Sequence, residues 1–356
     1  MRIFFCWTHI SGYMAACWRA LAQSPGVEVA VLAFRSGDKE ANFRDDVVAG
    51  LNVRLLDERE RNDASLVRSI VVDAKPDVLV LPGWAYDPYR ALAFEPALAN
   101  AKRVMTMDTP FRGTMRQRLG RFKMASFFAR VDRVMVPGER AWQLARVLGF
   151  DEPKIRRGMY GVDYAALAPL HERRASQPGG WPRRFLFTGR YAQEKGIDVL
   201  LAAYAQYRKT VADPWPLTCC GMGDAKNLLA NQPGVEDLGF VQPADMPAVM
   251  AGSGVFVLAS RYDPWPLVIV ESSAAGLPIV CTEACGSAVE LVRGDYSGWL
   301  VATGDVADLV RGLVLAHESY NDLPLMGRRA QHLAEAYSAQ AFAQRWGQMC
   351  DELVRR

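Results

Sequence analysis

Short apolar runs rich in β-branched and aromatic residues alternate along the chain with stretches in which apolar residues recur every three or four positions. The first pattern predicts strands and the second predicts helices. In the first half the predicted strands are Ile3–Trp7, Glu28–Phe34, Val53–Leu56, Asp77–Pro82, Arg103–Met107 and Arg133–Val136. Most are separated by predicted helices, among them Tyr13–Gln23, Ser65–Ala74 and Glu139–Leu148. This alternation indicates an α/β protein whose parallel sheets are covered on both faces.

The alternation stops at residues 169–184, where prolines, a Gly-Gly pair and arginines leave no apolar period. Strands are predicted again at Phe185–Gly189, Leu217–Cys220, Val235–Phe240, Val255–Leu258 and Pro278–Thr282. Helices are predicted at Ile197–Arg208, at Met246–Ala251 and from Ala339 to the end of the chain. We therefore expect two doubly wound domains, 1–170 and 185–336, joined by a linker at 171–184 and followed by a helix at 337–356.

The composition is that of a folded protein, because 50% of the 356 residues are hydrophobic and 23% are charged. Charged residues interrupt every apolar run before it is long enough to cross a membrane, and the first residues lack the features of a signal peptide. Seven cysteines, two of them adjacent at Cys219 and Cys220, do not suit a disulfide framework or a zinc site. These features predict a cytoplasmic protein with buried free thiols.

The net charge of +3 conceals a basic segment. Between Arg103 and Arg133 there are eight basic residues and only two acids, Asp108 and Asp132, which favours an anionic partner. Within residues 112–133, Met115, Leu119 and Phe122 would cluster on one side of a helix, but Arg118 lies among them and Phe127 and Phe128 fall elsewhere. Two interpretations stay open: a helix on the sheet with a solvated basic edge, or contact with an anionic acceptor or a membrane.

Three loops that follow predicted strands could carry chemistry. The first strand leads through His9 and Gly12 into a helix, where a glycine lets a ligand approach the backbone and the helix N-terminus favours an anion. A plain turn and a structural histidine would explain the same residues. After the strand at 185–189, Arg190 and Lys195 precede a helix, which suits a pyrophosphate as well as two solvated cations.

Two carboxylates stand eight residues apart in the third loop and the segment after it, at Asp263 and Glu271. A helix that begins near Pro266 and ends near Gly276 would place Glu271 about one turn from its start. There the carboxylate could accept hydrogen bonds from sugar hydroxyls, or simply complement the helix dipole.

Together these motifs resemble a known family. The order Gly-Arg-x4-Lys-Gly, Gly221-Met222-Gly223, Leu238-Gly239-Phe240-Val241 and acid-x7-Glu-x4-Gly-x-Pro is similar to the second domain of retaining family 4 (group 1) glycosyltransferases. In the first domain, residues 134–138 and 161–163 resemble the family's passage into the linker. The resemblance implies the GT-B fold: two Rossmann-like domains that face each other across a cleft, with a C-terminal helix that crosses back to the first.

The resemblance also implies roles for individual residues. Arg190 and Lys195 would hold the diphosphate of a nucleotide-sugar donor, Asp263 the sugar, and Glu271 the ribose. The other implied donor-binding residues are Gly12, Gly189, Gly221, Phe240, Val241, Trp265, Pro266, Leu267 and Val268. Asp108 stands where many relatives carry a histidine near the reacting carbon. Two further departures are Asp263, where Glu is usual, and Pro266, where Gly is frequent.

The function expected from this resemblance is metal-independent, retaining transfer of a sugar from a UDP- or GDP-sugar to a hydroxyl of a saccharide, lipid-linked or small-molecule acceptor. No cofactor, metal or nucleic acid is expected, and contact with a membrane is considered only for residues 112–133. Two other interpretations remain: an inactive glycosyltransferase-like interaction subunit, and a sugar-nucleotide epimerase or phosphorylase of the same fold.

Overall fold

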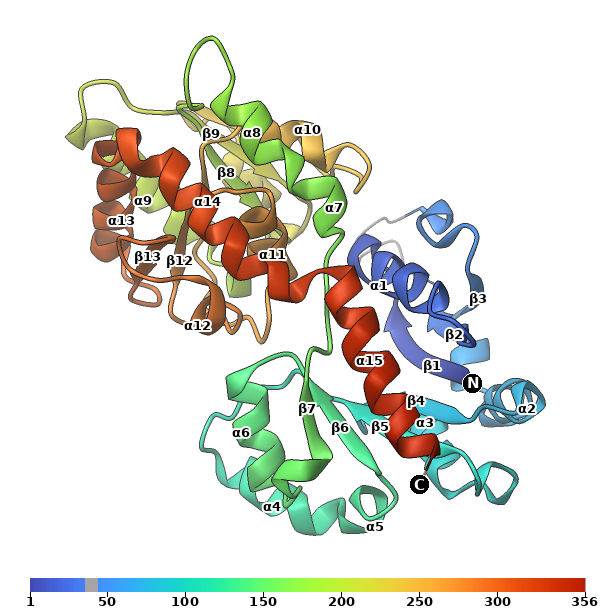
Figure 1. Ribbon diagram of the computed structural model, residues 1–356. Coiled ribbons are helices and arrows are strands. Elements are labelled where there is room, and N and C mark those ends of the chain that lie inside the picture. The colour runs from blue at the N-terminus through green and yellow to red at the C-terminus, as the bar shows by residue number, and fades with distance from the viewer. Residues whose placement is uncertain (36–43, 356) are drawn as a thin grey trace. The chain divides into compact units, whose positions relative to one another are not determined.

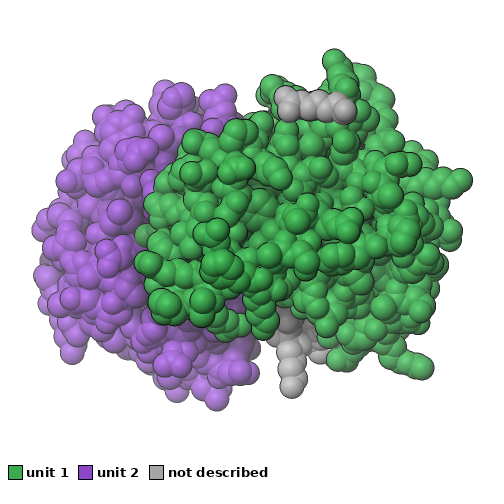
Figure 2. Space-filling view, turned by 90° about the horizontal axis from the view of Figure 1, so that it is seen from below, with its two compact units in different colours: residues 1–37, 43–161, 339–356 green, residues 38–42, 162–338 purple. Residues whose placement is uncertain are grey.

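The computed structural model describes residues 1–35 and 44–355, which form two compact units (Figure 2). The first unit contains residues 1–35, 44–161 and 339–355, and the second contains residues 162–338. The chain therefore leaves the first unit after Gly161 and returns to it at Ala339. Arg356, the last residue of the predicted C-terminal helix, lies outside the described residues.

The first unit is built on a parallel sheet of seven strands in the order β3-β2-β1-β4-β5-β6-β7 (Figure 1). The strands are β1 (Arg2–His9), β2 (Glu28–Phe34), β3 (Asn52–Leu56), β4 (Val78–Pro82), β5 (Lys102–Thr106), β6 (Arg133–Val136) and β7 (Ile155–Arg157). Its helices are α1 (Gly12–Ala22), α2 (Ala64–Ala74), α3 (Asp87–Ala91), α4 (Met115–Lys123), α5 (Ala125–Phe128), α6 (Glu139–Val147) and α15 (Ala339–Val354).

Both faces of this sheet are buried. Phe4 and Cys6 of β1 belong to the apolar core on one face, and Ile3, Phe5 and Trp7 belong to the core on the other. This arrangement explains why the strand sequences are continuously apolar, since helices cover a parallel sheet on both sides.

The C-terminal helix α15 completes the second of these cores. It contacts α1, and the ring of its Trp346 lies 5.1 Å from the ring of Phe5 in β1 (Figure 1). The indole nitrogen of Trp346 donates to the carbonyl oxygen of Gly158 at 3.2 Å. The return of the final helix to the first domain, implied by the resemblance, is confirmed.

The second unit contains a parallel sheet of six strands in the order β10-β9-β8-β11-β12-β13. The strands are β8 (Phe185–Thr188), β9 (Leu217–Cys220), β10 (Val235–Asp237), β11 (Val255–Leu258), β12 (Ile279–Thr282) and β13 (Gly298–Val301). The helices are α7 (Tyr164–Leu167), α8 (Pro169–Ala175), α9 (Ile197–Thr210), α10 (Met246–Ala251), α11 (Leu267–Ala274), α12 (Ala288–Leu291), α13 (Val306–Glu318) and α14 (Leu323–Ala334). The predicted class, two Rossmann-like α/β domains, is therefore confirmed.

Three local features differ from the sequence prediction. Strands β7 and β13 were not predicted, because two of the three residues of β7 are arginines and β13 begins with a glycine, which is uncommon in strands. The predicted linker begins inside α8, whose Leu170, His171 and Arg174 are buried in the second unit. The segment 112–133 contains two helices, α4 and α5, which are separated at Met124. Phe127 and Phe128 belong to α5 and are buried. Within the described residues no helix is both long and apolar enough to span a membrane.

Candidate functional site

The order of strands in the second unit singles out one edge of its sheet as the candidate site. The chain enters the sheet at β8, builds β9 and β10 on one side, and then crosses to β11 on the other. In such sheets ligands bind beyond the carboxyl ends of the strands, where the direction of winding reverses. The loops at this point are residues 189–196 after β8 and 259–266 after β11.

These two loops touch each other closely. The loop after β8 contains a 3₁₀ turn, Gln193–Lys195, and ends at Gly196 with a φ of 66°. A Cβ atom at Gly196 would lie 1.9 Å from the carbonyl oxygen of Ala259, so only glycine fits there. The carbonyl oxygen of Glu194 accepts hydrogen bonds from the backbone N–H groups of Arg261 at 2.8 Å and Tyr262 at 3.3 Å.

The main ionic contact between the loops joins two predicted site residues. Lys195 Nζ lies 2.5 Å from Asp263 Oδ2, and the two side chains are 20% and 7% exposed. Asp263 also accepts a hydrogen bond from the backbone N–H of Trp265. Burial raises the pKa of Asp263 above its ordinary value, and the positive charge of Lys195 opposes that rise.

Arg190 is exposed and forms an ion pair with Glu194 of the same loop. The positive charge of Arg190 also opposes the rise in the pKa of Asp263 that burial causes. Arg261 makes two hydrogen bonds of 2.7 Å to the carboxylate of Asp198 in α9 and so anchors the other loop. No sequence motif marks Arg261, Asp198 or Glu194, because Arg261 meets the Asp198 carboxylate and the Glu194 carbonyl oxygen only in the folded chain, 63 and 67 residues away.

Helix α11 begins where the second loop ends. Pro266 precedes its first residue, and Gly276, with a φ of 73°, follows its end, as the sequence predicted. Among the described residues, the backbone N–H groups of Leu267 and Val268 have no acceptor, and no side chain caps this end. Free N–H groups at a helix N-terminus provide a binding site for an anion.

Glu271 lies in the same helix, half-buried and without a hydrogen-bond or ion-pair partner in the described part of the chain. Loss of hydration raises its pKa to about 7. The buried indole nitrogen of Trp265 is likewise without a partner among residues 1–35 and 44–355. A desolvated carboxylate and an unused donor suit a ligand that carries hydroxyl groups.

The remaining predicted donor-binding residues of this unit lie along the same edge of the sheet. A Cβ atom at Gly221 would lie 1.9 Å from the carbonyl oxygen of Gly189, so the ends of β8 and β9 approach too closely for a side chain. Phe240 and Val241 follow β10 and are half-buried.

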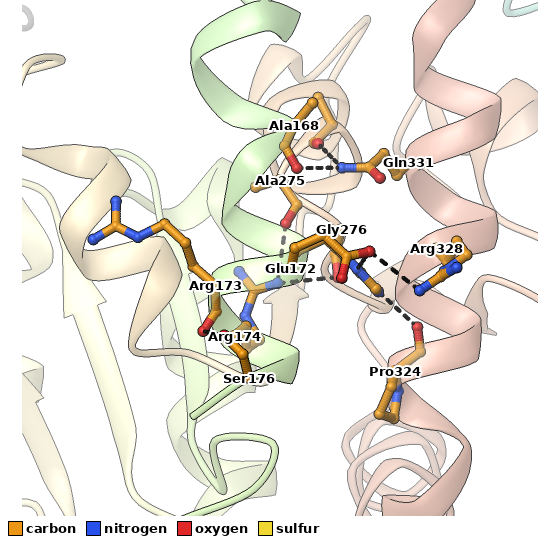
Figure 3. Close-up of polar contacts among 12 residues, drawn as sticks. Ala168, Glu172, Arg173, Arg174, Ser176, Ala275, Gly276, Pro324, Arg328 and Gln331 are labelled. Carbon is orange, nitrogen blue, oxygen red and sulfur yellow. Dashed lines mark hydrogen bonds and ion pairs between the residues drawn. The ribbon is translucent and has the colours of Figure 1, made fainter. Parts of the chain in front are cut away.

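The C-terminal end of α11 is held by a buried arginine that sequence analysis had assigned to the linker (Figure 3). The guanidinium group of Arg174 donates to the carbonyl oxygens of Ala275 at 3.0 Å, Gly276 at 3.2 Å and Met250 at 2.7 Å. It also lies 4.9 Å from the centre of the Trp181 ring. Burial lowers the pKa of Arg174 to about 9. Arg174 thus fixes the helix that carries Glu271.

Gly12, Asp108 and His9 belong to the first unit. Gly12 is the first residue of α1, after the capping residue Ser11, at the carboxyl end of β1. Asp108 follows β5, and its Oδ2 atom accepts a hydrogen bond of 3.0 Å from the hydroxyl of Tyr160. The ring of His9 meets the ring of Phe34 edge-on at 6.4 Å. In the first unit, Gly12 and Asp108 follow β1 and β5 at the carboxyl edge of the seven-stranded sheet.

Comparison with known proteins gives a match over the second unit. Residues 182–318 match the family model "Glycosyl transferases group 1". The chain is 32% identical over 181 residues to glycogen synthase of Mycobacterium tuberculosis, covering 49% of this chain and 41% of that protein. It is 27% identical over 234 residues to the GDP-mannose-dependent alpha-mannosyltransferase of the same organism, covering 63% and 55%. The chain thus spans about half the length of these curated relatives.

Solved structures match over nearly the whole chain. HepE of Anabaena, crystallised with UDP, superposes with a TM-score of 0.77 at 18% identity, covering 99% of this chain and all of that one. Sucrose-phosphate synthase of Thermosynechococcus elongatus gives a TM-score of 0.74 at 16% identity, with 99% of each chain covered. These likenesses show the fold. The family match confirms the resemblance drawn from the motifs between Phe185 and Pro278.

Proposed function

We propose that this protein, whose second unit contains a group 1 glycosyltransferase domain, transfers a sugar from a nucleotide-diphosphate donor to an acceptor hydroxyl. The observation that carries the proposal is the Lys195–Asp263 pair at the point where the sheet reverses its winding. We assign the cation of this pair to a diphosphate and its carboxylate to a sugar. The unused N–H groups of α11 and the unpaired Glu271 lie on the helix that follows.

The donor's diphosphate would bind to Lys195, Arg190 and the N–H groups of Leu267 and Val268. A lysine ammonium carries three donors, so Lys195 can keep its bond to Asp263 and still donate to phosphate oxygens. Pro266 has no N–H to contribute, which limits the helix contribution to the next two residues.

The nucleoside and the sugar would bind on either side of the diphosphate. Glu271 would accept hydrogen bonds from the ribose hydroxyls, with Phe240 and Val241 beside the base. Gly189 and Gly221 would lie beside the ligand, at the ends of β8 and β9. Asp263 would contact the donor sugar, with its carboxylate held by the backbone N–H of Trp265. Gly12, the first residue of α1 in the first unit, is a candidate for binding an anion at that helix N-terminus.

The reaction breaks the bond between the anomeric carbon and the diphosphate oxygen, and forms one between that carbon and the acceptor oxygen. Negative charge grows on the leaving diphosphate, so fixed cations and N–H groups lower the barrier. We propose that the configuration at the anomeric carbon is retained. The acceptor's proton then passes to the departing phosphate on the same face, and Asp108 of the first unit is a candidate catalytic residue.

We propose that no divalent metal or cofactor is required, since Lys195 and Arg190 supply the charge that a metal would otherwise provide. The acceptor is a saccharide, a lipid-linked saccharide or a small molecule with a free hydroxyl group. UDP and GDP are the candidate nucleotides. The relatives that suggest them are HepE, crystallised with UDP, and a mannosyltransferase named for GDP-mannose.

Thermal unfolding of the full chain with a panel of nucleoside diphosphates and nucleotide sugars tests this function. A ligand that binds only the folded state raises the melting temperature. We expect one nucleotide family to do so, and its sugar conjugate to be slowly hydrolysed with retention at the anomeric carbon. No shift with any nucleotide would contradict it, while binding without hydrolysis or transfer would favour the inactive, interacting subunit.

A further inference from the structure

Helix α4 of the first unit has an inner side that faces the protein and an outer side that does not. It lies against α6 (Figure 1), and none of its own residues is buried. Gln117 and Gly120 are half-buried, as is Met124 just after the helix. Gln117 Nε2 donates to the carbonyl oxygen of Pro110 at 2.8 Å, and the position of a Cβ on Gly120 is 3.4 Å from the Leu148 side chain.

The outer side of α4 carries the three most exposed large apolar side chains among the described residues. Met115, Leu119 and Phe122 are 67%, 56% and 70% exposed. At about 3.6 residues per turn these positions form one stripe, on the opposite side of the helix from residues 117, 120 and 124. The stripe therefore points away from the first unit. Met115, Leu119 and Phe122 do not pack α4 against the sheet.

Four cations border the stripe. Arg116 and Lys123 fall on one side of it and Arg118 and Arg121 on the other, and the helix contains no acidic residue. None of the four forms an ion pair with any residue in the described ranges. The guanidinium group of Arg121 lies 5.1 Å from the centre of the Phe122 ring.

We propose that the outer face of α4 is a docking surface for a membrane that contains anionic lipids. An apolar stripe between two rows of cations matches a surface of acyl chains beneath a layer of negative headgroups, with the helix lying in the plane of the interface. The long basic side chains extend toward the headgroup phosphates while their stems lie along apolar surface. This interaction surface is independent of the donor site in the second unit.

A second copy of the chain does not suit this surface. A twofold contact places the same patch on both partners, so four cations would face four cations. Like charges brought together at an interface oppose association, whereas an anionic bilayer neutralises all of them at once. The charge of the patch thus selects lipid over self-association.

Flotation of the full chain with vesicles tests the proposal. Vesicles of phosphatidylcholine with phosphatidylglycerol should carry the protein, and vesicles of phosphatidylcholine alone should carry much less. Arg118→Gln with Arg121→Gln should weaken binding by roughly 20-fold, because each cation near an anionic surface contributes about five-fold. Leu119→Ser with Phe122→Ser should weaken it by at least about ten-fold.

Matched control variants distinguish binding through α4 from nonspecific binding through other exposed apolar or basic side chains. Leu325→Ser removes a half-exposed leucine of α14, and Arg173→Gln with Lys209→Gln removes two charges from α8 and α9. Both should float like the unaltered chain. Since no residue of α4 is buried, the α4 variants should keep the normal melting temperature.

Three results would overturn the proposal. They are no binding to the anionic vesicles, equal binding to both kinds of vesicle, and equal loss in the α4 and control variants. A fourth concerns self-association: if the chain forms dimers in solution that Phe122→Ser dissociates, a second copy covers the face.

Discussion

Lys195 and Asp263, 68 residues apart in sequence, form an ion pair of 2.5 Å that joins the two loops of the candidate donor site. The pair gives a reason for the short acidic residue at position 263. Because a carboxylate offers about four lone-pair sites, Asp263 can accept from Lys195 and from the backbone N–H of Trp265 and still accept a hydrogen bond from a sugar hydroxyl. The family resemblance shows only that position 263 carries an aspartate where a glutamate, one methylene longer, is usual.

We predict that Lys195→Ala lowers the transfer rate by roughly 10²–10³-fold, because its contact with the leaving diphosphate strengthens as charge develops. Arg190→Ala should lose less, since Arg190 is exposed and already pairs with Glu194. Steady-state kcat with the true donor measures both effects, and Lys209→Ala on the exposed end of α9 serves as the control. A near-normal kcat in Lys195→Ala would remove this lysine from the diphosphate site.

Asp263 and Glu271 are expected to act on different parts of the donor. Asp263→Asn should lower transfer strongly but change the affinity for the free nucleoside diphosphate by less than about three-fold, because Lys195 keeps its charge. Glu271→Gln should weaken that affinity by at least about ten-fold through loss of charged hydrogen bonds to ribose. Calorimetric titration distinguishes the two, and equal weakening would show that the division of roles is wrong.

Glu271 should also make stability depend on pH. Its carboxyl has an ordinary pKa of 4.5 and one of about 7 in the folded protein. Between these values the folded state holds more protons than the unfolded state, so the free energy of unfolding falls as pH rises, and the loss is complete above pH 7. Glu271→Gln should therefore stabilise the ligand-free protein above pH 7 by an amount on the order of 2 kcal/mol.

Melting curves recorded above pH 7 and near pH 4.5 check this expectation, with Glu318→Gln in α13 as the control. Near pH 4.5 the gain should shrink, because the carboxyl is then protonated in the folded state. A destabilised Glu271→Gln variant above pH 7 would mean that the carboxylate has a structural partner.

Arg174→Ala should destabilise the second unit by roughly 3 kcal/mol, because three buried carbonyl oxygens lose their donor. Its neighbour Arg173 is exposed, and Arg173→Ala should change stability by less than about 0.5 kcal/mol. Denaturant unfolding of the two variants provides a matched comparison. Equal stabilities would show that water replaces the guanidinium group without cost.

Transfer should persist after complete removal of divalent ions, because two side-chain cations serve the diphosphate. The initial rate in EDTA, compared with the rate after Mg²⁺ or Mn²⁺ is restored, provides the measurement. Loss of activity in EDTA with recovery on addition of metal would contradict the proposed charge balance.

The sequence predicts the fold well because the strands of a parallel sheet are buried on both faces. Glu28–Phe34, Arg133–Val136 and Val255–Leu258 were predicted with their observed limits, since each is a continuous apolar or β-branched run between polar segments. Ile155–Arg157 was not predicted, because two of its three residues are arginines and its pairing with β6 depends on tertiary structure.

From the sequence, only the residue types of the candidate site and their spacing along the chain could be predicted. The motifs located Lys195, Asp263 and Glu271, but nothing in the sequence shows that the first two form an ion pair or that the third has no partner. Arg174 was hidden for a related reason: arginines beside Pro and Gly-Gly are typical of a solvated linker. Only the packing of α8 against α10 and the end of α11 places its guanidinium group inside the protein.

In the proposed function, the loops after β8 and β11 bind the diphosphate of a nucleotide through Lys195. Calorimetric titration of UDP and of GDP into the unaltered chain, Lys195→Ala and Lys209→Ala tests it most directly. We expect saturable binding of one nucleotide to the unaltered chain and to Lys209→Ala, and an affinity at least about ten-fold weaker for Lys195→Ala. Equal affinities in all three proteins, or no binding of either nucleotide, would contradict it.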